Sequence, residues 1–277
     1  MADDDAFLVR FWGVRGSIAC GGPATARYGG NTSCVEMRCG PHRLVFDAGT
    51  GIRLLGEEMM QDRLLDADLF FSHTHWDHIV GLPFFRPAHK PENRFTVWAG
   101  HLVPGSSIES VLRLAMAPPL FPVPLDMFRA RVTYRDFRAG ETLTPRPGLT
   151  LRTAPLNHPN GATGYRVEYD GKAVCYITDT EHTPGVPDRN ILGLIDGADI
   201  VIYDSTYTDE ELPRFTGWGH STWQQGVRLC RAAHAKRLVL FHHDPCRDDA
   251  ALEAVERAAD DAMSGTIAAR EGMTLRP

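Results

Sequence analysis

The sequence lacks the long apolar runs, paired cysteines and basic stretches that mark several large classes of protein. No apolar run is long enough to span a membrane, so we expect no membrane-embedded segment. The six cysteines are scattered and form no Cys-X-X-Cys pair, which argues against a disulfide framework and favours a reducing compartment. Residues 1–5 are mostly acidic and lack the basic and apolar regions of a secretory signal. We therefore expect a cytoplasmic protein.

The net charge of −6 comes from scattered acidic residues, and no stretch resembles a basic stripe for nucleic acid. This counts weakly against a large polyanionic substrate, although a net-acidic protein can still contain a local basic cleft. The 277 residues contain no linker rich in serine and glycine, no low-complexity run and no internal repeat. We therefore predict one domain that spans residues 1–277.

Strand patterns and helical patterns alternate along the chain, and the first half is richer in strands. Two sheets packed face to face with helices outside would accommodate this order, so we predict an α/β fold. We expect strands at residues 7–12, 33–38, 43–46, 69–72, 94–98, 131–134, 150–153, 164–169, 173–177, 199–203 and 237–241. We expect helices at residues 52–60, 79–85, 107–116, 191–195, 222–234 and 248–263.

Three histidines and one aspartate are concentrated between His73 and His78, directly after the apolar stretch 69–71. Side chains two residues apart in an extended segment point the same way, so His73 and His75 can reach one metal ion together. If the chain then turns into a helix, Asp77 and His78 face a second ion beside the first. These ligand types suit zinc and are acceptable to iron or manganese. A surface loop that binds nothing would explain one histidine but not this density.

Three more candidate ligands, His158, Asp179 and His242, each follow an apolar strand pattern. Any one of them alone could be a cap or a turn residue, but together with the cluster they supply enough ligands for two ions. His243 is the rival of His242, although on a strand it would face the opposite way. We predict that one ion is held by His73, His75 and His158, the other by Asp77, His78 and His242, and that Asp179 bridges the two. A water between two such ions is acidified and acts as hydroxide near neutral pH.

The motif His73-Thr74-His75-Trp76-Asp77-His78 resembles the HxHxDH signature of the metallo-β-lactamase superfamily. Asp47, His158, Asp179 and His242 match the other motifs of that family in order and approximate spacing, over nearly the whole chain. The resemblance implies an αββα sandwich with a dimetal site at one edge of the sheets. It also implies that Asp47 orients the ligands without binding the metal.

Two later segments resemble the branch of the family that contains tRNase Z and other phosphodiesterases. The segment Gly219-His220-Ser221-Thr222 is similar to the HST motif of that branch, and Asp204 lies where the branch has an acidic residue that orients this histidine. Phosphodiester cleavage releases an alkoxide, and a histidine held by a carboxylate can give it a proton. We therefore predict Asp77, His220 and Asp204 as catalytic residues. The alternative for His220 is an ordinary residue at a helix N-terminus.

The segments 13–18 and 28–33 are similar to bacterial proteins related to phosphoribosyl cyclic phosphodiesterases. The first of them can also be a tight connection between strands, and whether Arg15 contacts a phosphate is left open. The segment 117–127 is rich in prolines, which favours an irregular lid or pocket wall. Whether it contacts substrate or only packs in the core is also left open.

Only twenty residues separate His158 from Asp179, where bacterial tRNase Z enzymes carry a long arm for the tRNA elbow. We therefore expect a dimetal hydrolase of a small or cyclic phosphodiester, with no tRNA substrate. We expect two divalent ions, Zn²⁺ first, with Mn²⁺ or Fe²⁺ as alternatives. The alternative functions are hydrolysis of a lactam, lactone or thioester, and a non-catalytic metal-dependent sensor. The resemblance alone suggests a homodimer.

Overall fold

The strands of the chain assemble into two sheets of seven strands each, in a computed structural model that describes residues 7–277. The first sheet has the order β14 (Thr274–Leu275), β1 (Phe7–Gly13), β2 (Cys34–Cys39), β3 (His42–Phe46), β4 (Asp66–Phe71), β5 (Arg94–Ala99) and β6 (Arg131–Asp136). The second has the order β13 (Ile267–Ala268), β12 (Leu238–Phe241), β11 (Ile200–Asp204), β10 (Lys172–Ile177), β9 (Ala162–Tyr169), β8 (Thr150–Leu156) and β7 (Thr142–Leu143).

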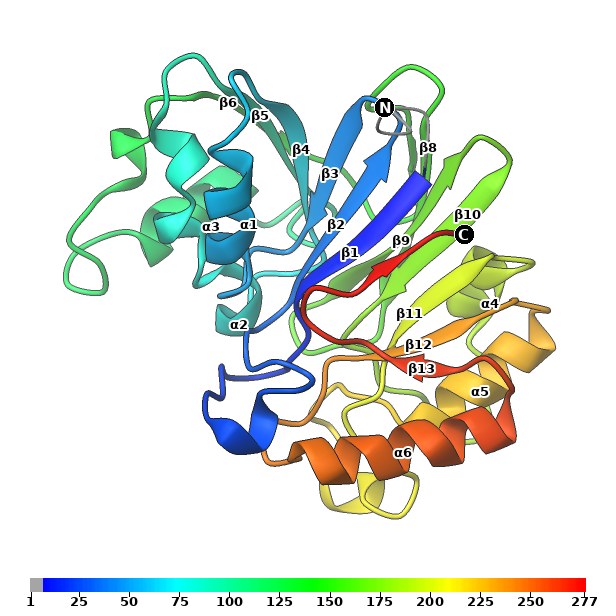
Figure 1. Cartoon of the computed structure of the whole chain (residues 1–277). Helices are drawn as coiled ribbons and strands as arrows, with labels where there is room; N and C mark the ends of the chain where they lie inside the picture. The colour runs from blue at the N-terminus through cyan, green and yellow to red at the C-terminus, as the bar shows by residue number, and fades with distance from the viewer. Residues whose placement is uncertain (1–6) are drawn as a thin grey trace.

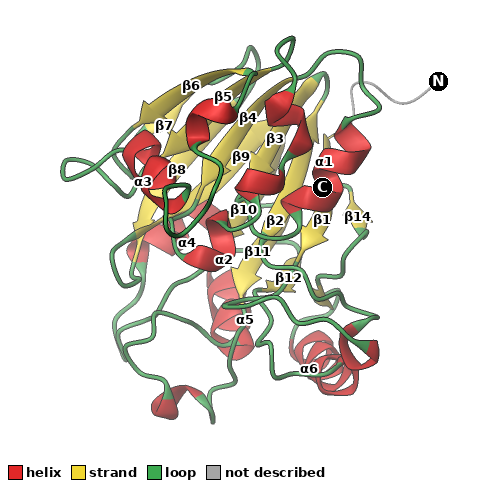
Figure 2. Ribbon diagram, turned by 90° about the vertical axis from the view of Figure 1, so that its left-hand side faces the viewer, coloured by secondary structure: helices red, strands yellow, loops and turns green. Residues whose placement is uncertain are grey.

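Helices cover the outer face of each sheet. Figure 1 shows α1, α2 and α3 beside the first sheet and α4, α5 and α6 beside the second, so the layers follow the order αββα. Figure 2 shows the molecule from the side of α1 and α3, with β6 and β7 at the upper left. The helices are α1 (Ile52–Met59), α2 (Trp76–Ile79), α3 (Ile108–Ala115), α4 (Arg189–Ile195), α5 (Trp223–Ala232) and α6 (Asp249–Ala262). Single 3-10 turns, η1 to η5, occupy Pro23–Thr25, Leu82–Phe84, Arg86–His89, Leu125–Met127 and Leu212–Arg214.

Aromatic side chains fill the space between the sheets. Phe46 stacks on Phe70 with ring centroids 5.4 Å apart, and Tyr165 of the second sheet packs edge-on against Phe46, also at 5.4 Å. Tyr176 and Phe241 continue this layer at 5.5 Å. Edge-to-face and offset contacts of this kind add to the stability that burial provides. The two sheets are therefore fixed against each other, and so are the loops at their ends.

The strand directions bring the candidate site residues to one edge of the sandwich. In the first sheet β3 and β4 are parallel, and in the second β10, β11 and β12 are parallel. Strand β8 has the direction of β10, because β9 is antiparallel to both. The segments that follow β3, β4, β8, β10, β11 and β12 carry, in turn, Asp47, His73, His158, Asp179, Thr206 and His242.

Most elements lie within a few residues of their predicted positions, and the main differences have local causes. The helix predicted over 79–85 is the short helix α2 followed by the 3-10 turn η2, because Pro83 has no N–H to donate to residue 79. Strand β8 continues to Leu156, beyond its predicted end at residue 153. The two-residue strands β7, β13 and β14 were not predicted, because such short strands leave no periodic pattern. No helix within residues 7–277 is both long and apolar enough to cross a membrane.

Candidate metal centre

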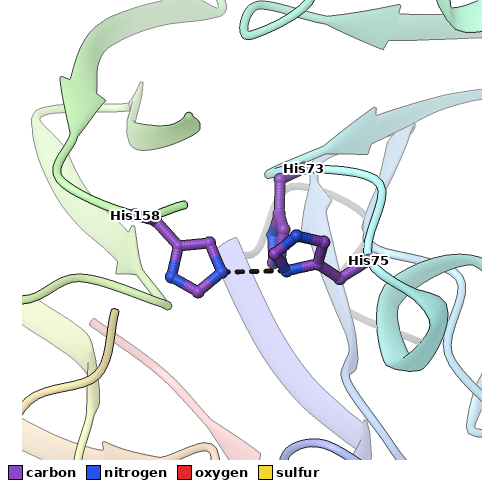
Figure 3. Close-up of side chains that lie close together, drawn as sticks. All are labelled: His73, His75 and His158. Carbon is purple, nitrogen blue, oxygen red and sulfur yellow. Dashed lines mark hydrogen bonds between the residues drawn. The ribbon is translucent and has the colours of Figure 1, made fainter. Parts of the chain in front are cut away.

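Three histidine side chains from two loops converge at the sheet edge. Figure 3 shows the rings of His73, His75 and His158 directed toward one another. The Nδ1 atom of His75 is 3.0 Å from the Nε2 atom of His158. The ring centroid of His73 is 4.5 Å from that of His75 and 4.7 Å from that of His158. The nitrogen atoms of these three side chains are thus close enough together to ligate a single ion.

A second group forms beside the first where the chain turns into α2. His75 is the N-cap of this helix and has an extended backbone, so Asp77 and His78 lie in the first turn as predicted. The Oδ2 atom of Asp77 is 3.2 Å from Nε2 of His78 and 3.2 Å from Nε2 of His242. All three side chains are buried. An acidic residue is also favoured at this end of a helix by the helix dipole.

The carboxylate of Asp179 lies between the two groups. Its Oδ1 atom is 3.9 Å from Nε2 of His73 and 3.8 Å from Nε2 of His158. The same oxygen is 3.4 Å from Nε2 of His242, and Oδ2 is 3.3 Å from Nε2 of His78. Oδ1 therefore lies near side chains of both groups and Oδ2 near the second group, so this carboxylate is placed where it could serve both.

The donor atoms of the cluster fit divalent metal ions. The Nε2 atoms of His73 and His78 are buried and form no hydrogen bond with any group of residues 7–277, which is costly unless a ligand occupies the space between them. Burial lowers the pKa of His73, His75 and His158, and so favours the neutral imidazole that metals bind. Imidazole with carboxylate suits zinc and is compatible with iron or manganese.

Asp47 supports the cluster through hydrogen bonds to residues around it. Its Oδ1 accepts from the backbone N–H of Ser72 at 2.7 Å, and its Oδ2 accepts from the Ser72 hydroxyl at 2.7 Å and the Tyr176 hydroxyl at 2.8 Å. The Nδ1 atom of His78 is 2.8 Å from Oδ2 of Asp47. When Nδ1–H donates to this carboxylate, Nε2 keeps its lone pair and faces Asp77 and Asp179. This contact agrees with the orienting role expected of Asp47.

His242 and not the adjacent His243 faces the cluster. The ring of His243 lies on the other side of the chain, with Nε2 2.9 Å from the backbone oxygen of Ala269. Burial lowers the pKa of His243 to about 3, so this ring is neutral and donates to that carbonyl. Strand β12 ends at Phe241 and His242 has a φ of 58°, so the chain turns at His242 and directs the two rings to different sides.

Arg15 has a structural position and no access to the cluster or to solvent. It is fully buried, and its Nε donates to the backbone oxygen of Gly29 at 2.8 Å. Its Nη1 donates to the backbone oxygens of Asp244 at 3.0 Å and Arg247 at 2.7 Å. Arg15 therefore joins three loops, which leaves no support for a contact with a substrate phosphate.

His220 and Asp204 form a buried pair next to the cluster. The Nδ1 atom of His220 is 3.1 Å from Oδ2 of Asp204 and 3.6 Å from Oδ1 of Asp179. Burial opposes the charged imidazole, but the carboxylate of Asp204 outweighs it and raises the pKa of His220 to about 9. The cap of α5 is Thr222, whose hydroxyl accepts from the backbone N–H of Gln225 at 3.0 Å. His220 is thus not the helix cap and lies two residues before it.

Comparison with known families agrees with this geometry. A family model described as "Beta-lactamase superfamily domain" matches residues 42–243. The chain belongs to the β-lactamase superfamily. The αββα order of its layers is the fold that the sequence motifs implied.

This β-lactamase superfamily protein is similar to a curated relative and to several solved structures. It is 28% identical to a protein named Ribonuclease Z from Natronomonas pharaonis, over 93% of each chain. Among solved structures, Zn²⁺-bound PqqB from Methylobacterium extorquens matches with a TM-score of 0.73 and 18% identity, over 98% of this chain and 100% of that one. A diphosphatase from the PhnP family matches with a TM-score of 0.71 and 18% identity, over 98% of both chains. At such identities the solved structures establish the fold alone.

The glycine-rich segment 13–18 of this superfamily member packs directly on the candidate ligands. A Cβ atom on Gly16 would lie 2.3 Å from the ring of His242, so only glycine fits there. The backbone N–H of Ser17 donates to Oδ2 of Asp77 at 2.8 Å, and Ser17 has a φ of 62°. The segment is therefore more than a tight connection between strands, because it supports two side chains of the second group.

The sequence did not reveal the partners that hold the remaining histidines. The backbone oxygen of Gly219 is 2.8 Å from Nδ1 of His158, and the hydroxyl of Thr206 is 3.0 Å from Nδ1 of His242. The side-chain amide of Asn160 is 3.3 Å from Nε2 of His75. Backbone oxygens carry no sequence signal, and hydroxyl and amide side chains are common in loops. These contacts could therefore be found only from the structure.

Glu181 fastens the loop that leads to His220. Its carboxylate accepts from the backbone N–H groups of Gly217 at 2.9 Å and Gly219 at 2.8 Å. The backbone N–H of Glu181 donates to the oxygen of Asn157 at 2.8 Å, and the side-chain amide of Asn157 donates back to the oxygen of Glu181, also at 2.8 Å. Glu181 thus joins the loops that carry His158, Asp179 and His220.

Proposed function

We propose that this β-lactamase superfamily protein is a metal-dependent phosphodiesterase. The single observation that supports it best is the His220–Asp204 pair, which places a buried proton donor beside a cluster of histidines and carboxylates. A leaving alkoxide needs such a donor, whereas transfer of an acyl group does not require it. The likeness to a protein named Ribonuclease Z over most of the chain supports the same reaction class.

The assignment of ligands follows the two groups of side chains. We assign His73, His75 and His158 to one divalent ion, Asp77, His78 and His242 to the other, and Asp179 to both. Zn²⁺ is our first choice, with Mn²⁺ or Fe²⁺ as alternatives. When bound, such ions polarise a phosphoryl oxygen and lower the pKa of a water molecule.

The protein's own groups then orient the site and move the proton. Asp47 holds the ring of His78, and Ser17 holds Asp77, so that both side chains keep their direction toward the centre. Asp204 accepts from Nδ1 of His220 and stabilises the protonated ring. His220 can then release a proton to the oxygen of the leaving group. Asp77 and Asp204 therefore act together with His220 in the proposed catalytic set.

We propose that the substrate is a small or cyclic phosphodiester and not tRNA. Strands β9 and β10 occupy most of the twenty residues between His158 and Asp179 and are joined by the turn Asp170-Gly171. This hairpin belongs to the second sheet, so the segment contains no arm that could extend toward a tRNA. Action on RNA is the second candidate, because the relative from Natronomonas pharaonis is named Ribonuclease Z.

A substrate screen tests this proposal. Protein loaded with Zn²⁺, Mn²⁺ or Fe²⁺ would be assayed on bis(p-nitrophenyl) phosphate, nucleoside 2′,3′-cyclic phosphates, linear dinucleotides and a tRNA precursor. A lactam, a lactone and a thioester complete the panel. Hydrolysis of the small phosphodiesters supports the proposal, and cleavage of the tRNA precursor alone would replace it with the second candidate. Hydrolysis of only the carboxylic compounds would contradict both.

A further inference from the structure

Three arginines lie side by side on the first sheet, away from the metal centre. In the parallel ladder of β5 and β6, Arg94 is directly opposite Arg131, and Trp98 is directly opposite Arg135. Residues two apart share a face of a strand, so Arg94 and Trp98 lie on one face of β5, and Arg131 and Arg135 lie on the same face of β6. Thr96 and Thr133 occupy the positions between them. We call these six residues the arginine face.

The charges of this face are not neutralised within the protein. Arg94, Arg131 and Arg135 are exposed, and none forms an ion pair with a carboxylate of residues 7–277. The guanidinium of Arg135 lies 5.4 Å above the ring of Trp98, a contact that attracts the cation but supplies no negative charge to neutralise it. Like charges directly opposite each other on neighbouring strands are destabilising. The chain has a net charge of −6, so this local concentration of positive charge is unusual for it. We infer that the face binds an anionic partner.

The arginine face lines a hollow of about 560 Å³ at the β6 and β7 end of the two sheets. Figure 2 shows β5, β6 and β7 together at the upper left of the molecule. The hollow also contains Asp66, Asp68 and Arg146, so its lining carries four arginines and two aspartates. Arg146 donates from Nε to Asp68 at 2.6 Å and also pairs with Asp66. Asp66 lies directly opposite Arg94 in the ladder of β4 and β5, but both carboxylates pair with Arg146, and the lining keeps an excess of positive charge.

The distances between the three arginines indicate which kind of anion can contact all of them. Arg94 and Arg131 lie on adjacent strands, roughly 4.8 Å apart, whereas Arg131 and Arg135 are separated by about 13 Å along β6. One phosphate cannot reach all three, but successive phosphates of a nucleic-acid strand can. Guanidinium groups bind phosphate oxygens in pairs, and the hydroxyls of Thr96 and Thr133 can donate to the same backbone.

We propose that the arginine face binds the sugar–phosphate backbone of a short single-stranded oligonucleotide. The site is separate from the metal centre, because Arg94 and Arg131 begin their strands, whereas His73 follows the opposite end of the neighbouring strand β4. The proposal goes beyond the proposed function, and binding at this face does not require hydrolysis. A strand that lies along β6 from Arg131 to Arg135 runs toward the edge of the sheet that carries the cluster.

Fluorescence anisotropy of a labelled oligouridylate, measured in the presence of EDTA, tests this binding without metal-dependent cleavage. The unmodified protein should bind the strand with an affinity that falls as salt is raised. The triple variant Arg94→Gln, Arg131→Gln, Arg135→Gln should bind at least about tenfold more weakly. It should also reduce the slope of log Kd against log salt by about 2, since each contact with a single-strand phosphate contributes about 0.7.

A matched triple variant controls for net charge. Arg53, Arg63 and Arg257 are exposed, form no ion pair in the described part of the chain, and lie away from the hollow. Their replacement by glutamine changes the net charge equally and should alter the affinity less than twofold. The lysine triple at positions 94, 131 and 135 should keep most of the binding. Equal weakening in both glutamine triples, or no salt-dependent binding by the unmodified protein, would overturn the proposal, whatever the substrate screen gives.

Discussion

Asp204 accepts a hydrogen bond from His220, with 3.1 Å between Oδ2 and Nδ1. The same carboxylate accepts from the hydroxyl of Thr206 at 2.7 Å and from the backbone N–H of Thr180 at 3.2 Å. These contacts fix the direction of a fully buried carboxylate, which in turn fixes the imidazole beside the cluster. Phosphodiester cleavage needs a fixed proton donor at this place for the leaving alkoxide, whereas acyl transfer does not require one.

Replacement of His220 by alanine should lower kcat on small phosphodiesters by about 10²- to 10⁴-fold, the usual contribution of a positioned acid. Metal content should not change, since His220 is outside the proposed ligand set. Elemental analysis and steady-state kinetics measure the two quantities on the same sample. His42→Ala, at the start of β3, is the control histidine and should retain normal kcat. Full phosphodiesterase activity in the His220→Ala protein would exclude the proposed role.

The protonation of His220 should depend on Asp204. In the metal-free protein the pKa of His220 is raised from 6.5 to about 9 despite burial, chiefly by this carboxylate. Because the folded pKa lies above the unfolded one, the pair's contribution to stability is complete below about pH 6.5 and is lost as the pH rises through about 9. In Asp204→Asn burial dominates, so the pKa should fall. Imidazole ¹H–¹⁵N spectra recorded against pH measure both midpoints, and equal midpoints in the two proteins would contradict the coupling.

The sequence was sufficient for the parts of the site that depend on side-chain chemistry. The spacing of His73, His75 and His78 indicated the cluster, and apolar strands before Asp179 and His242 indicated which later residues join it. The outer contacts could not be predicted in this way, because the oxygen of Gly219 and the N–H of Ser17 belong to the backbone. Their positions depend on how distant loops pack, which no local pattern encodes.

The arginine face could not be predicted from the sequence either, because it depends on how distant segments pair. Arg94 and Arg131 are thirty-seven positions apart in the sequence, and no run of basic residues marks either one. Only the parallel pairing of β5 with β6 places them opposite each other. Net charge and local composition left a local basic cleft open but did not locate it, whereas the pairing of the two strands places these arginines on one face.

Loss of Asp179 should affect both proposed ions, whereas loss of His158 should affect mainly one. Asp179 contacts side chains of both groups, but His158 belongs to the group of His73 and His75. We expect close to two ions per chain in the unmodified protein, one in His158→Ala and less than one in Asp179→Ala. Elemental analysis after dialysis against a weak chelator measures this series. Two retained ions in Asp179→Ala would show that the bridge is assigned wrongly.

Glu181→Gln should weaken the loop that supports His158 and His220. The amide has no negative charge and only one acceptor oxygen, so the bonds from Gly217 and Gly219 become weaker. We expect a loss of about tenfold in affinity for the ion assigned to His158, which is typical of contacts behind a ligand. Chelator competition measures this affinity, and Glu210→Gln, an exposed change nearby, is the control. If both variants bound the ion with equal affinity, Glu181 would not contribute to metal binding and would have a purely structural role.

Gly16→Ala should damage the second group of ligands although it adds only one methyl group. The new Cβ would lie 2.3 Å from the ring of His242, and this ring is enclosed by the contacts of Thr206 and Asp77. His242 must then shift away from Asp77, so the ion assigned to them should be lost and activity should fall with it. Gly21→Ala, a few residues after that segment, is the matched control, because no atom lies within 4 Å of its added Cβ. Metal content and kcat measured on the two variants should differ clearly, and normal values in Gly16→Ala would contradict the proposed packing of the glycine-rich segment against His242.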